Sequence, residues 1–347
     1  MANSMDTERF EGDMVLTSPT SNTDNPLVNM YPSALGETHV LQEYGRFSLR
    51  TVLELCRMIR EKNVDIIHTH GYKSDILGLI AAKKTGIKSV STAHGYESNP
   101  AFKLGLYFKI GAMALKYFDI VAPLSPELYE YCKSFNIKPD RLRLIPNGVD
   151  LTEIDALEPP QQKSTNTDGT RYIGYVGRLA RHKYVKDLIS SFAILAPKFP
   201  ELRLRIVGDG VQKEALEVQA MELGLAERVD FLGFRDDRLE LMRDLEIFGM
   251  TSSSEGVPRV MMEAMSLKRP VVAYNILGVD QLIFEGDTGL LAEFGDIEKF
   301  ASQCEKFLND PALAAAHGER ARSFIEKGFS GQSLARKYGE LFEELTA

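Results

Sequence analysis

Two glutamates stand on either side of a predicted helix start. Glu255 precedes Gly256 and Pro258, which suit a tight turn and the first turn of a helix, and Glu263 lies farther along that helix. The free backbone N–H groups expected at Gly256 and Val257 form a phosphate site, and carboxylates on either side accept hydrogen bonds from sugar hydroxyls. The alternative is that Glu255 caps the helix and Glu263 is a solvated acid.

Two cations follow a predicted strand in the same half of the chain. Arg178 comes directly after the strand Tyr172–Val176 and Gly177, and Lys183 follows near the start of the next helix. The guanidinium fork of arginine binds phosphate oxygens, and the lysine ammonium adds a point charge beside it. These residues predict an anion site, with solvated charges as the alternative. The turn Val207–Gly210 also ends a strand, and tight turning alone explains its glycines.

Three histidines are expected at one edge of a sheet in the first half of the chain. His68 and His70 end one predicted strand on the same face, and His94 ends the next strand. Zinc binds imidazole, so a zinc site is one interpretation, but no cysteine or carboxylate has a matching spacing. We favour a polar substrate wall, with His94 near the reacting centre.

Alternating strands and helices position the residues of the second half. This alternation follows a polar, proline-containing segment at residues 158–169, which is typical of an interdomain linker. It predicts a parallel sheet covered on both faces, in a doubly wound, Rossmann-like domain. The expected strands are Tyr172–Val176, Leu202–Val207, Val229–Leu232, Ile247–Thr251, Val271–Tyr274 and Gly289–Ala292, with helices at Val185–Leu195 and Gln212–Leu223.

The first half has the same pattern and predicts a second Rossmann-like domain. Two such domains place a cleft between the carboxyl ends of their sheets, where ligands of these folds bind. A last helix near Gln332–Leu345 finishes the second domain or crosses back onto the first, and the residues leave both open. The expected strands are Val64–Thr69, Lys88–Thr92, Asp119–Ala122 and Leu142–Ile145, and the expected helices are Ser48–Lys62, Ser74–Lys84 and Pro126–Phe135.

Length and composition exclude several classes of protein. The 347 residues suit two domains, and 44% hydrophobic with 26% charged residues is typical of globular proteins. Residues 1–150 carry 17 basic and 17 acidic side chains, so the net charge of −8 comes from the second half and argues against nucleic-acid binding. No apolar run is long enough to span a bilayer. Three distant cysteines indicate reduced packing residues of a cytoplasmic protein: Cys56, Cys132 and Cys304.

Together these residues resemble the retaining glycosyltransferases of the GT-B fold known as family 4. The resemblance runs from about residue 38 to the C-terminus, and the Glu255–Glu263 string is its most specific part. It implies an α/β fold of two Rossmann-like, doubly wound domains that face each other across a cleft. The matching strings are His68-Thr-His-Gly71, Ser91-Thr-Ala-His-Gly95, Pro146-Asn-Gly-Val-Asp150, Gly177-Arg-Leu179 with Lys183, Phe231-Leu-Gly233, Ser254-Glu-Gly-Val-Pro258 through Glu263-Ala-Met265, Pro270-Val-Val-Ala273 and Gly286-Asp-Thr-Gly-Leu-Leu291.

The resemblance also implies a reaction and roles for particular residues. A sugar would pass from a nucleotide-diphosphate sugar to an acceptor with retention of configuration, without an obligatory metal or other cofactor. Arg178 and Lys183 would bind the donor diphosphate and neutralise the leaving group. Glu263 would bind the ribose and Glu255 would face the donor sugar. His94 would contact that sugar from the first domain, so that closure of the cleft completes the site.

The resemblance further implies that the C-terminal segment crosses back onto the first domain. We therefore expect an acceptor-side domain at residues 1–157 with 331–347, a linker at 158–169 and a donor domain at 170–330. The acceptor is expected to be a sugar, a lipid-linked molecule or a small molecule, in polysaccharide, glycolipid or cell-envelope glycan synthesis. Two other classes stay open, a non-catalytic sugar-nucleotide-binding subunit and a sugar-nucleotide epimerase on the same fold.

The sequence departs from the family pattern at several positions. The family usually has glycine at Tyr184, glutamate at His182 and a small residue in place of the Lys268-Arg269 pair, and it often has glutamate where Gln281 aligns. These departures bear on the donor sugar more than on the fold. Gly12–Thr17 already looks like the family's second strand, so a first βα unit is expected to be missing and turnover to be weaker.

One segment of the first half has a composition that suits a membrane surface. Ala101–Phe118 interleaves aromatic and aliphatic residues with Lys103, Lys109 and Lys116, as an interfacial helix does. A domain helix with snorkelling lysines gives the same pattern. We expect a cytoplasmic protein, and peripheral contact with the inner face of an anionic membrane is a further hypothesis.

Overall fold

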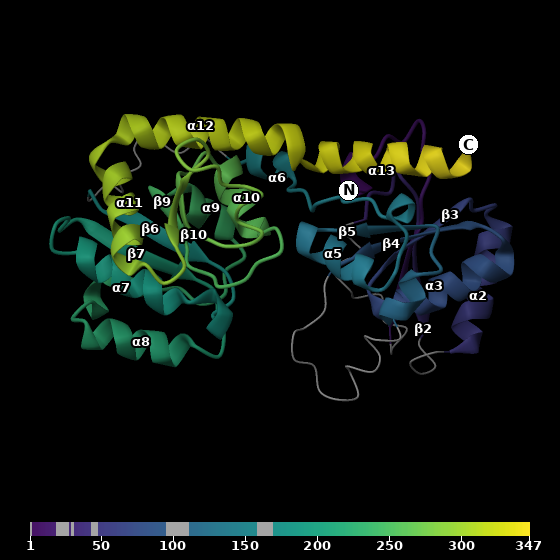
Figure 1. Cartoon of the computed structure of the whole chain (residues 1–347), viewed down its shortest axis with the longest axis horizontal. Helices are drawn as coiled ribbons and strands as arrows, with labels where there is room; N and C mark the ends of the chain where they lie inside the picture. Colours follow the sequence, from purple (N-terminus) through teal and green to yellow (C-terminus); the bar gives the residue numbers. More distant parts are fainter. Residues whose placement is uncertain (1, 19–27, 29–30, 43–47, 95–110, 158–168) are drawn as a thin grey trace. The chain divides into compact units, whose positions relative to one another are not determined.

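The chain folds into two compact units. The computed structural model describes residues 2–18, 28, 31–42, 48–94, 111–157 and 169–347. Unit 1 comprises Met1–Asn147 together with Gly331–Ala347, and unit 2 comprises Gly148–Ser330. In each unit parallel strands are flanked by helices (Figure 1). The α/β fold class predicted from the sequence is confirmed.

The strands described in unit 2 form one parallel sheet. Their order across the sheet is β11-β10-β9-β6-β7-β8, so the chain moves outward from β6 to β8 and then returns to the other side of β6. The first strand and the fourth are therefore neighbours at the point where the winding reverses. The strands are β6 (Arg171–Val176), β7 (Leu202–Val207), β8 (Val229–Phe231), β9 (Ile247–Met250), β10 (Val271–Asn275) and β11 (Leu290–Glu293).

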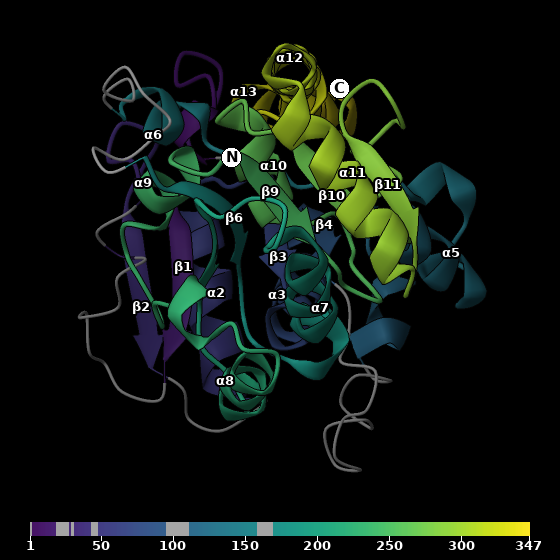
Figure 2. The same ribbon diagram turned by 90° about the vertical axis from the view of Figure 1, so that its left-hand side faces the viewer.

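The sheet of unit 2 lies between two hydrophobic cores. In β6, Ile173 and Tyr175 point into one core and Val176 into the other, as the two-residue period of a strand requires. Figures 1 and 2 show α8 and α12 on opposite faces of the sheet. The helices over the first core are α7 (Val185–Leu195), α8 (Lys213–Glu222) and α11 (Ile297–Asn309). Those over the second are α6 (Leu151–Asp155), α9 (Arg238–Arg243), α10 (Arg259–Ser266) and α12 (Pro311–Gly328).

The described strands of unit 1 form two groups of parallel strands. The first pairs β1 (Met14–Ser18) with β2 (Thr38–Gln42). The second has the order β3-β4-β5. Its strands are β3 (Ile66–His70), β4 (Lys88–Ala93) and β5 (Ile120–Pro123). The α-helices of the unit whose bounds lie within the described residues are α2 (Leu49–Glu61), α3 (Tyr72–Thr85), α5 (Pro126–Ser134) and α13 (Gly331–Thr346). The prediction of a strand at Leu142–Ile145 is wrong, because this segment forms only an isolated bridge, between Leu142 and Val121.

The C-terminal helix α13 belongs to unit 1. Its residues Tyr338 and Leu341 are buried in a core with Val90 of β4 and Ile120 of β5. Of the two placements that the sequence left open, the structure therefore has the one in which the last segment returns to the first half of the chain. This helix covers the face of β3 and β4 on which His68 lies.

The predicted domain boundary at residue 157 is corrected to residue 147. The N–H of Val149 donates a hydrogen bond to the carbonyl of Phe329 at 2.8 Å, and Val149 forms a bridge with Ser330. Leu151 and Ile154 of α6 are buried in the second core of unit 2. Residues 148–157 therefore fold with unit 2, and the predicted linker lies, apart from Gly169, outside the described residues.

A buried acid in unit 1 makes its stability depend on pH. Asp75 of α3 is 3% exposed, and its Oδ1 accepts hydrogen bonds from the hydroxyls of Thr69 (2.6 Å) and Ser91 (2.8 Å). Burial raises the pKa of Asp75 from 3.8 to about 6 despite these two bonds. Because the folded-state pKa lies above the unfolded one, the protonated acid stabilises the fold below pH 4, and this contribution is lost as the pH rises through 6.

We predict that Asp75→Asn stabilises the protein at pH 7.5 by about 2 kcal/mol and has little effect near pH 4. The amide oxygen can still accept both hydroxyl bonds, while the buried charge is removed. Urea unfolding of the wild type and the variant at the two pH values measures the difference. Asp65→Asn, at an exposed position of the same unit, is the control, and an equal gain at both pH values would contradict the prediction.

Candidate active site

An ion pair joins the carboxyl ends of β6 and β9 in unit 2. The Nζ atom of Lys183 donates to Oε1 of Glu255 at 2.5 Å, and the hydroxyl of Ser252 donates to the same oxygen at 2.6 Å. The two charged side chains are only 19% and 10% exposed. Because β6 and β9 meet where the winding of the sheet reverses, this pair occupies the edge at which doubly wound sheets bind ligands.

The loop that carries Lys183 is fastened to the end of β9. Thr251 Oγ1 donates to the carbonyl of Tyr184 at 2.9 Å, and the N–H of Ser253 donates to the carbonyl of His182 at 2.8 Å. These bonds leave little freedom for the short helix Arg181–Lys183. The position of Lys183 beside Glu255 is therefore set by backbone contacts as well as by charge.

Tyr184 occupies a backbone conformation that favours glycine. Its φ is 47° and its ψ is 36°, in the left-handed region, where a side chain costs free energy. The ring packs edge-on against Phe294 with centroids 5.0 Å apart, and the Nζ of Lys186 lies 5.0 Å from its centroid. The family's usual glycine at this position has a physical reason, and in this chain aromatic packing holds the strained residue in place.

Arg178 offers a free cation at the same edge. Its side chain is exposed, and within the described residues its guanidinium makes no hydrogen bond or ion pair. Its backbone is fixed, because its carbonyl accepts bonds from the hydroxyl of Tyr175 (3.1 Å) and from the N–H of Ala180 (3.0 Å). An exposed guanidinium on a fixed loop is suited to bind an anion.

The glycines of the Val207–Gly210 turn allow two backbones to touch. A Cβ on Gly208 would lie 1.9 Å from the carbonyl oxygen of Gly177, and one on Gly210 would lie 2.4 Å from that of Leu179. The N–H of Leu179 also donates to the carbonyl of Asp209 at 2.8 Å. The turn therefore supports the loop that carries Arg178, a role beyond the tight turning inferred from the sequence.

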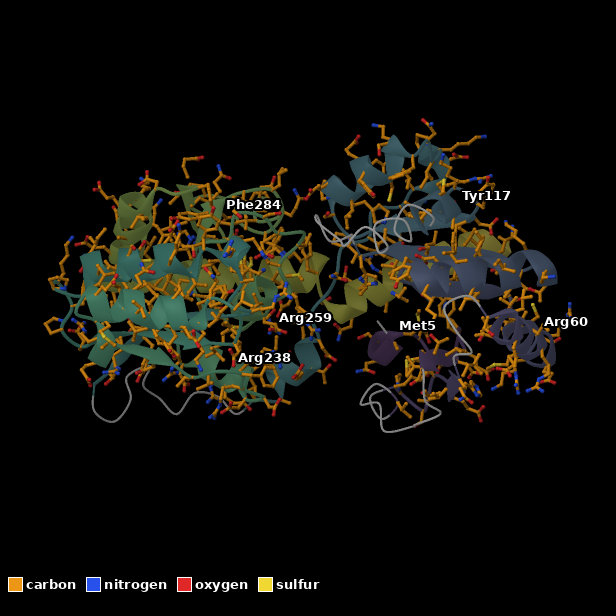
Figure 3. All side chains as sticks on the ribbon, turned by 90° about the horizontal axis from the view of Figure 1, so that it is seen from below. Met5, Arg60, Tyr117, Arg238, Arg259 and Phe284 are labelled. Carbon is orange, nitrogen blue, oxygen red and sulfur yellow. The ribbon has the colours of Figure 1, made fainter. Side chains whose placement is uncertain are left out.

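Glu263 is buried in α10 and held by two arginines. Its side chain is 5% exposed, and its Oε1 accepts bonds from Arg238 Nη2 (3.1 Å) and Arg259 Nε (3.2 Å). Figure 3 labels the two arginines in unit 2. Sequence reasoning found neither arginine. Arg259 stands one helical turn before Glu263, a spacing that signals such a pair. Arg238 comes from α9 and carries no local signal.

The start of α10 corrects the expected helix N-terminus. The helix begins at Arg259, because Pro258 has an extended ψ of 110° and acts as its N-cap. Gly256 and Val257 therefore lie in the turn before the helix and are not part of its first turn. This turn packs against another loop, since a Cβ on Gly278 would lie 1.7 Å from the carbonyl oxygen of Gly256.

The three histidines of unit 1 lie together at the carboxyl ends of β3 and β4. His70 Nδ1 and His94 Nε2 share a hydrogen bond of 2.9 Å, and the rings of His68 and His70 pack at a tilt of 41° with centroids 4.4 Å apart. His68 Nε2 is turned instead to Thr92 Oγ1 at 2.7 Å. Desolvation lowers the pKa of each imidazole, that of His70 to about 4, so the cluster is neutral at pH 7.

The metal-like groupings of unit 1 do not favour a zinc site. The nitrogens of His68, His70 and His94 do not converge on one point. Within the described residues the only group whose ligand atoms converge lies at the amino ends of β1 and β2 and consists of Asp13, Glu37 and His39. Lys62 already supplies a cation there, with its Nζ at 2.6 Å from Asp13 and 2.8 Å from Glu37.

Comparison with known proteins gives the class of the chain. The model of Glycosyltransferase Family 4 matches residues 15–153, and that of Glycosyl transferases group 1 matches residues 158–324. The structure of Anabaena HepE in complex with UDP superposes with a TM-score of 0.78 at 22% identity, covering 95% of this chain and 92% of HepE. The fold and these matches define a glycosyltransferase with the GT-B fold. The chain belongs to glycosyltransferase family 4.

Two curated relatives have more specific descriptions. The putative glycosyltransferase EpsD of Bacillus subtilis is 28% identical over 287 residues, which cover 79% of this chain and 75% of EpsD. An Escherichia coli enzyme, UDP-Gal:alpha-D-GlcNAc-diphosphoundecaprenol alpha-1,3-galactosyltransferase, is 27% identical over 310 residues, covering 86% of this chain and 80% of that protein.

In the part of this chain that the structure describes, no helix is both long and apolar enough to cross a membrane.

We predict that Gly278→Ala destabilises the protein and disturbs the turn that follows Glu255. The new Cβ would meet the carbonyl oxygen of Gly256, and the φ of 90° adds backbone strain of about 1 kcal/mol. Gly286→Ala is the matched control, because its φ is 77° but its Cβ would meet nothing within 4 Å. Urea unfolding should show that Gly278→Ala lowers the free energy of unfolding by about 2 kcal/mol more than Gly286→Ala does. Equal decreases for the two variants would argue against this close packing.

Proposed function

We propose that this glycosyltransferase moves a sugar from a nucleotide-diphosphate sugar to an acceptor with retention of configuration and without an obligatory metal. One observation carries the proposal. Arg178, Lys183 and Glu255 project from the loops after β6 and β9, at the reversal point of the unit 2 sheet. Two cations and one carboxylate there match the chemistry of a diphosphate attached to a sugar.

The two cations would hold the donor diphosphate. The exposed guanidinium of Arg178 can donate two parallel hydrogen bonds to phosphate oxygens, and Lys183 adds a second positive charge. As the bond from sugar to phosphate breaks, negative charge grows on the leaving diphosphate, and fixed cations lower the free energy of that state. Metal independence is proposed because these side chains can supply the positive charge that a divalent ion would otherwise provide.

The carboxylates would orient the two sugar rings of the donor. Glu255 Oε1 is occupied by Lys183 and Ser252, so we assign its second oxygen to the hydroxyls of the transferred sugar. Both arginine bonds to Glu263 go to its Oε1, and we assign its Oε2 to the ribose. His94 of unit 1 would contact the transferred sugar. The backbone N–H groups of Gly256 and Val257, in the turn before α10, would contact the phosphates.

The relatives support a role in polysaccharide, glycolipid or cell-envelope glycan synthesis. The E. coli relative is named for a galactosyl donor and a diphosphoundecaprenol-linked acceptor, and HepE was solved with UDP. We accordingly propose a nucleotide-sugar donor and a sugar or lipid-linked acceptor. Most of the segment at 101–118 lies outside the described residues, so its contact with a membrane stays a prediction.

We predict that one member of a panel of UDP-, GDP- and ADP-sugars binds saturably and is slowly hydrolysed without acceptor. Arg178→Ala should weaken that binding about 10- to 100-fold, since it removes a charge-assisted bond to phosphate. Arg181→Ala is the matched control, because Arg181 is an exposed arginine on the same loop. Calorimetry measures binding, and nucleotide release measures hydrolysis.

The same panel tests the metal and the alternative classes. EDTA should change neither binding nor hydrolysis, and a loss of both that Mg²⁺ restores would contradict metal independence. Binding without hydrolysis or transfer to any acceptor would favour a sugar-nucleotide-binding subunit, and interconversion of two donor sugars would favour an epimerase. Equal weakening by the Arg178 and Arg181 variants would contradict the assigned phosphate site.

A further inference from the structure

We infer that His70 is a positioning residue that holds His94 through the hydrogen bond between their imidazoles. The inference rests on the proposed function, in which His94 contacts the transferred sugar. His70 is the last residue of β3 and pairs in register with Thr92 of β4, so His94 follows two residues beyond that pair. The register thus brings His70 Nδ1 within 2.9 Å of His94 Nε2.

His70 is itself supported from the interior of unit 1. Its ring packs at a tilt against that of His68, whose centroid lies 4.4 Å away. His68 is anchored in turn, because its Nε2 bonds to Thr92 Oγ1 (2.7 Å), and that oxygen bonds to the hydroxyl of Tyr338 on α13 (2.6 Å). The ring of Tyr338 also packs at a tilt against that of His68, with centroids 4.8 Å apart. The ring of His70 therefore lies against a His68 that is itself held by Thr92 and Tyr338, which limits how far the His70 ring can turn.

The shared bond fixes which nitrogen of His94 can meet a ligand. His94 Nε2 faces His70, so only Nδ1 remains for a sugar hydroxyl. Two neutral imidazoles that bond to each other hold one proton between them, so the tautomer of His70 also sets that of His94. Desolvation lowers the pKa of both rings, which keeps both neutral at pH 7. His70 thereby determines both the orientation and the donor or acceptor character of His94.

Three substitutions at His70 separate positioning from simple bulk. In His70→Asn the amide stands near the place of Nδ1 and can keep the bond to His94, whereas in His70→Gln it stands near the place of Nε2. We expect hydrolysis of the donor selected from the UDP-, GDP- and ADP-sugar panel to stay within about threefold for His70→Asn. It should fall at least tenfold for His70→Gln and His70→Ala, mainly in kcat, since misplacement of a contact group lowers turnover steeply. Equal activity of the three variants would overturn the inference.

A double-mutant cycle tests whether His70 acts through His94. If it does, His70→Ala causes no further loss of turnover in a protein that already carries His94→Ala. An equal loss of turnover in the wild-type and His94→Ala backgrounds would overturn the inference. Thermal unfolding of each variant identifies any that fails to fold. His94→Ala with wild-type turnover would instead remove the proposed role of His94 itself, and with it the function assigned here to His70.

A spectroscopic readout tests the pairing without any substrate. The chain has six histidines, and long-range ¹⁵N–¹H spectra of their side chains report the tautomer of each ring. We expect the His94 nitrogen signals to shift in His70→Ala and to stay near their wild-type positions in His70→Asn. Unchanged His94 signals in His70→Ala would overturn the inference while leaving the proposed transferase function intact.

Discussion

The adjacency of β6 and β9 is the constraint on which the candidate site depends. These strands are separated in sequence by β7, β8 and the helices α7, α8 and α9, yet they are neighbours because the winding of the sheet reverses between them. Their carboxyl ends bring Lys183 and Glu255 together in a largely buried ion pair. A pair of this kind is stable only where further hydrogen bonds satisfy it, and here Ser252, Thr251 and Ser253 supply them to the acid and to the loop.

Local patterns in the sequence predicted most of the architecture and the identity of the charged groups. The alternation of strands and helices in unit 2 can be predicted from the spacing of hydrophobic residues and from the residues that form turns. The bounds predicted for α7 are accordingly the observed ones. The residues Arg178, Lys183 and Glu255 stand at strand ends for the same reason. Their partners could not be predicted, because the bond from Arg238 to Glu263 joins two helices whose relation only the folded sheet defines.

Backbone geometry explains the remaining differences between expectation and structure. A proline was expected inside the first turn of α10, but the extended ψ of Pro258 delays the helix by one residue. Glycine is required at 208 and 210 because the backbone of Gly177 and Leu179 lies too close for a side chain. This contact comes from another segment of the chain, so the local sequence pattern does not predict it. At Tyr184 the sequence showed that the family's usual glycine is replaced. It did not show that this tyrosine adopts the left-handed backbone conformation.

The order of segments in the chain also affects how the protein is made. Unit 2 is continuous, whereas the core around Val90 and Ile120 of unit 1 needs Tyr338 and Leu341 from α13. During synthesis α13 leaves the ribosome after every residue of unit 2. Part of the core of unit 1 is therefore uncovered until α13 is made, whereas unit 2 can already fold. The usual order of domain completion is thereby reversed. The histidine cluster, in which His68 bonds to Thr92 and Thr92 in turn bonds to Tyr338, is among the last features of the molecule to assemble.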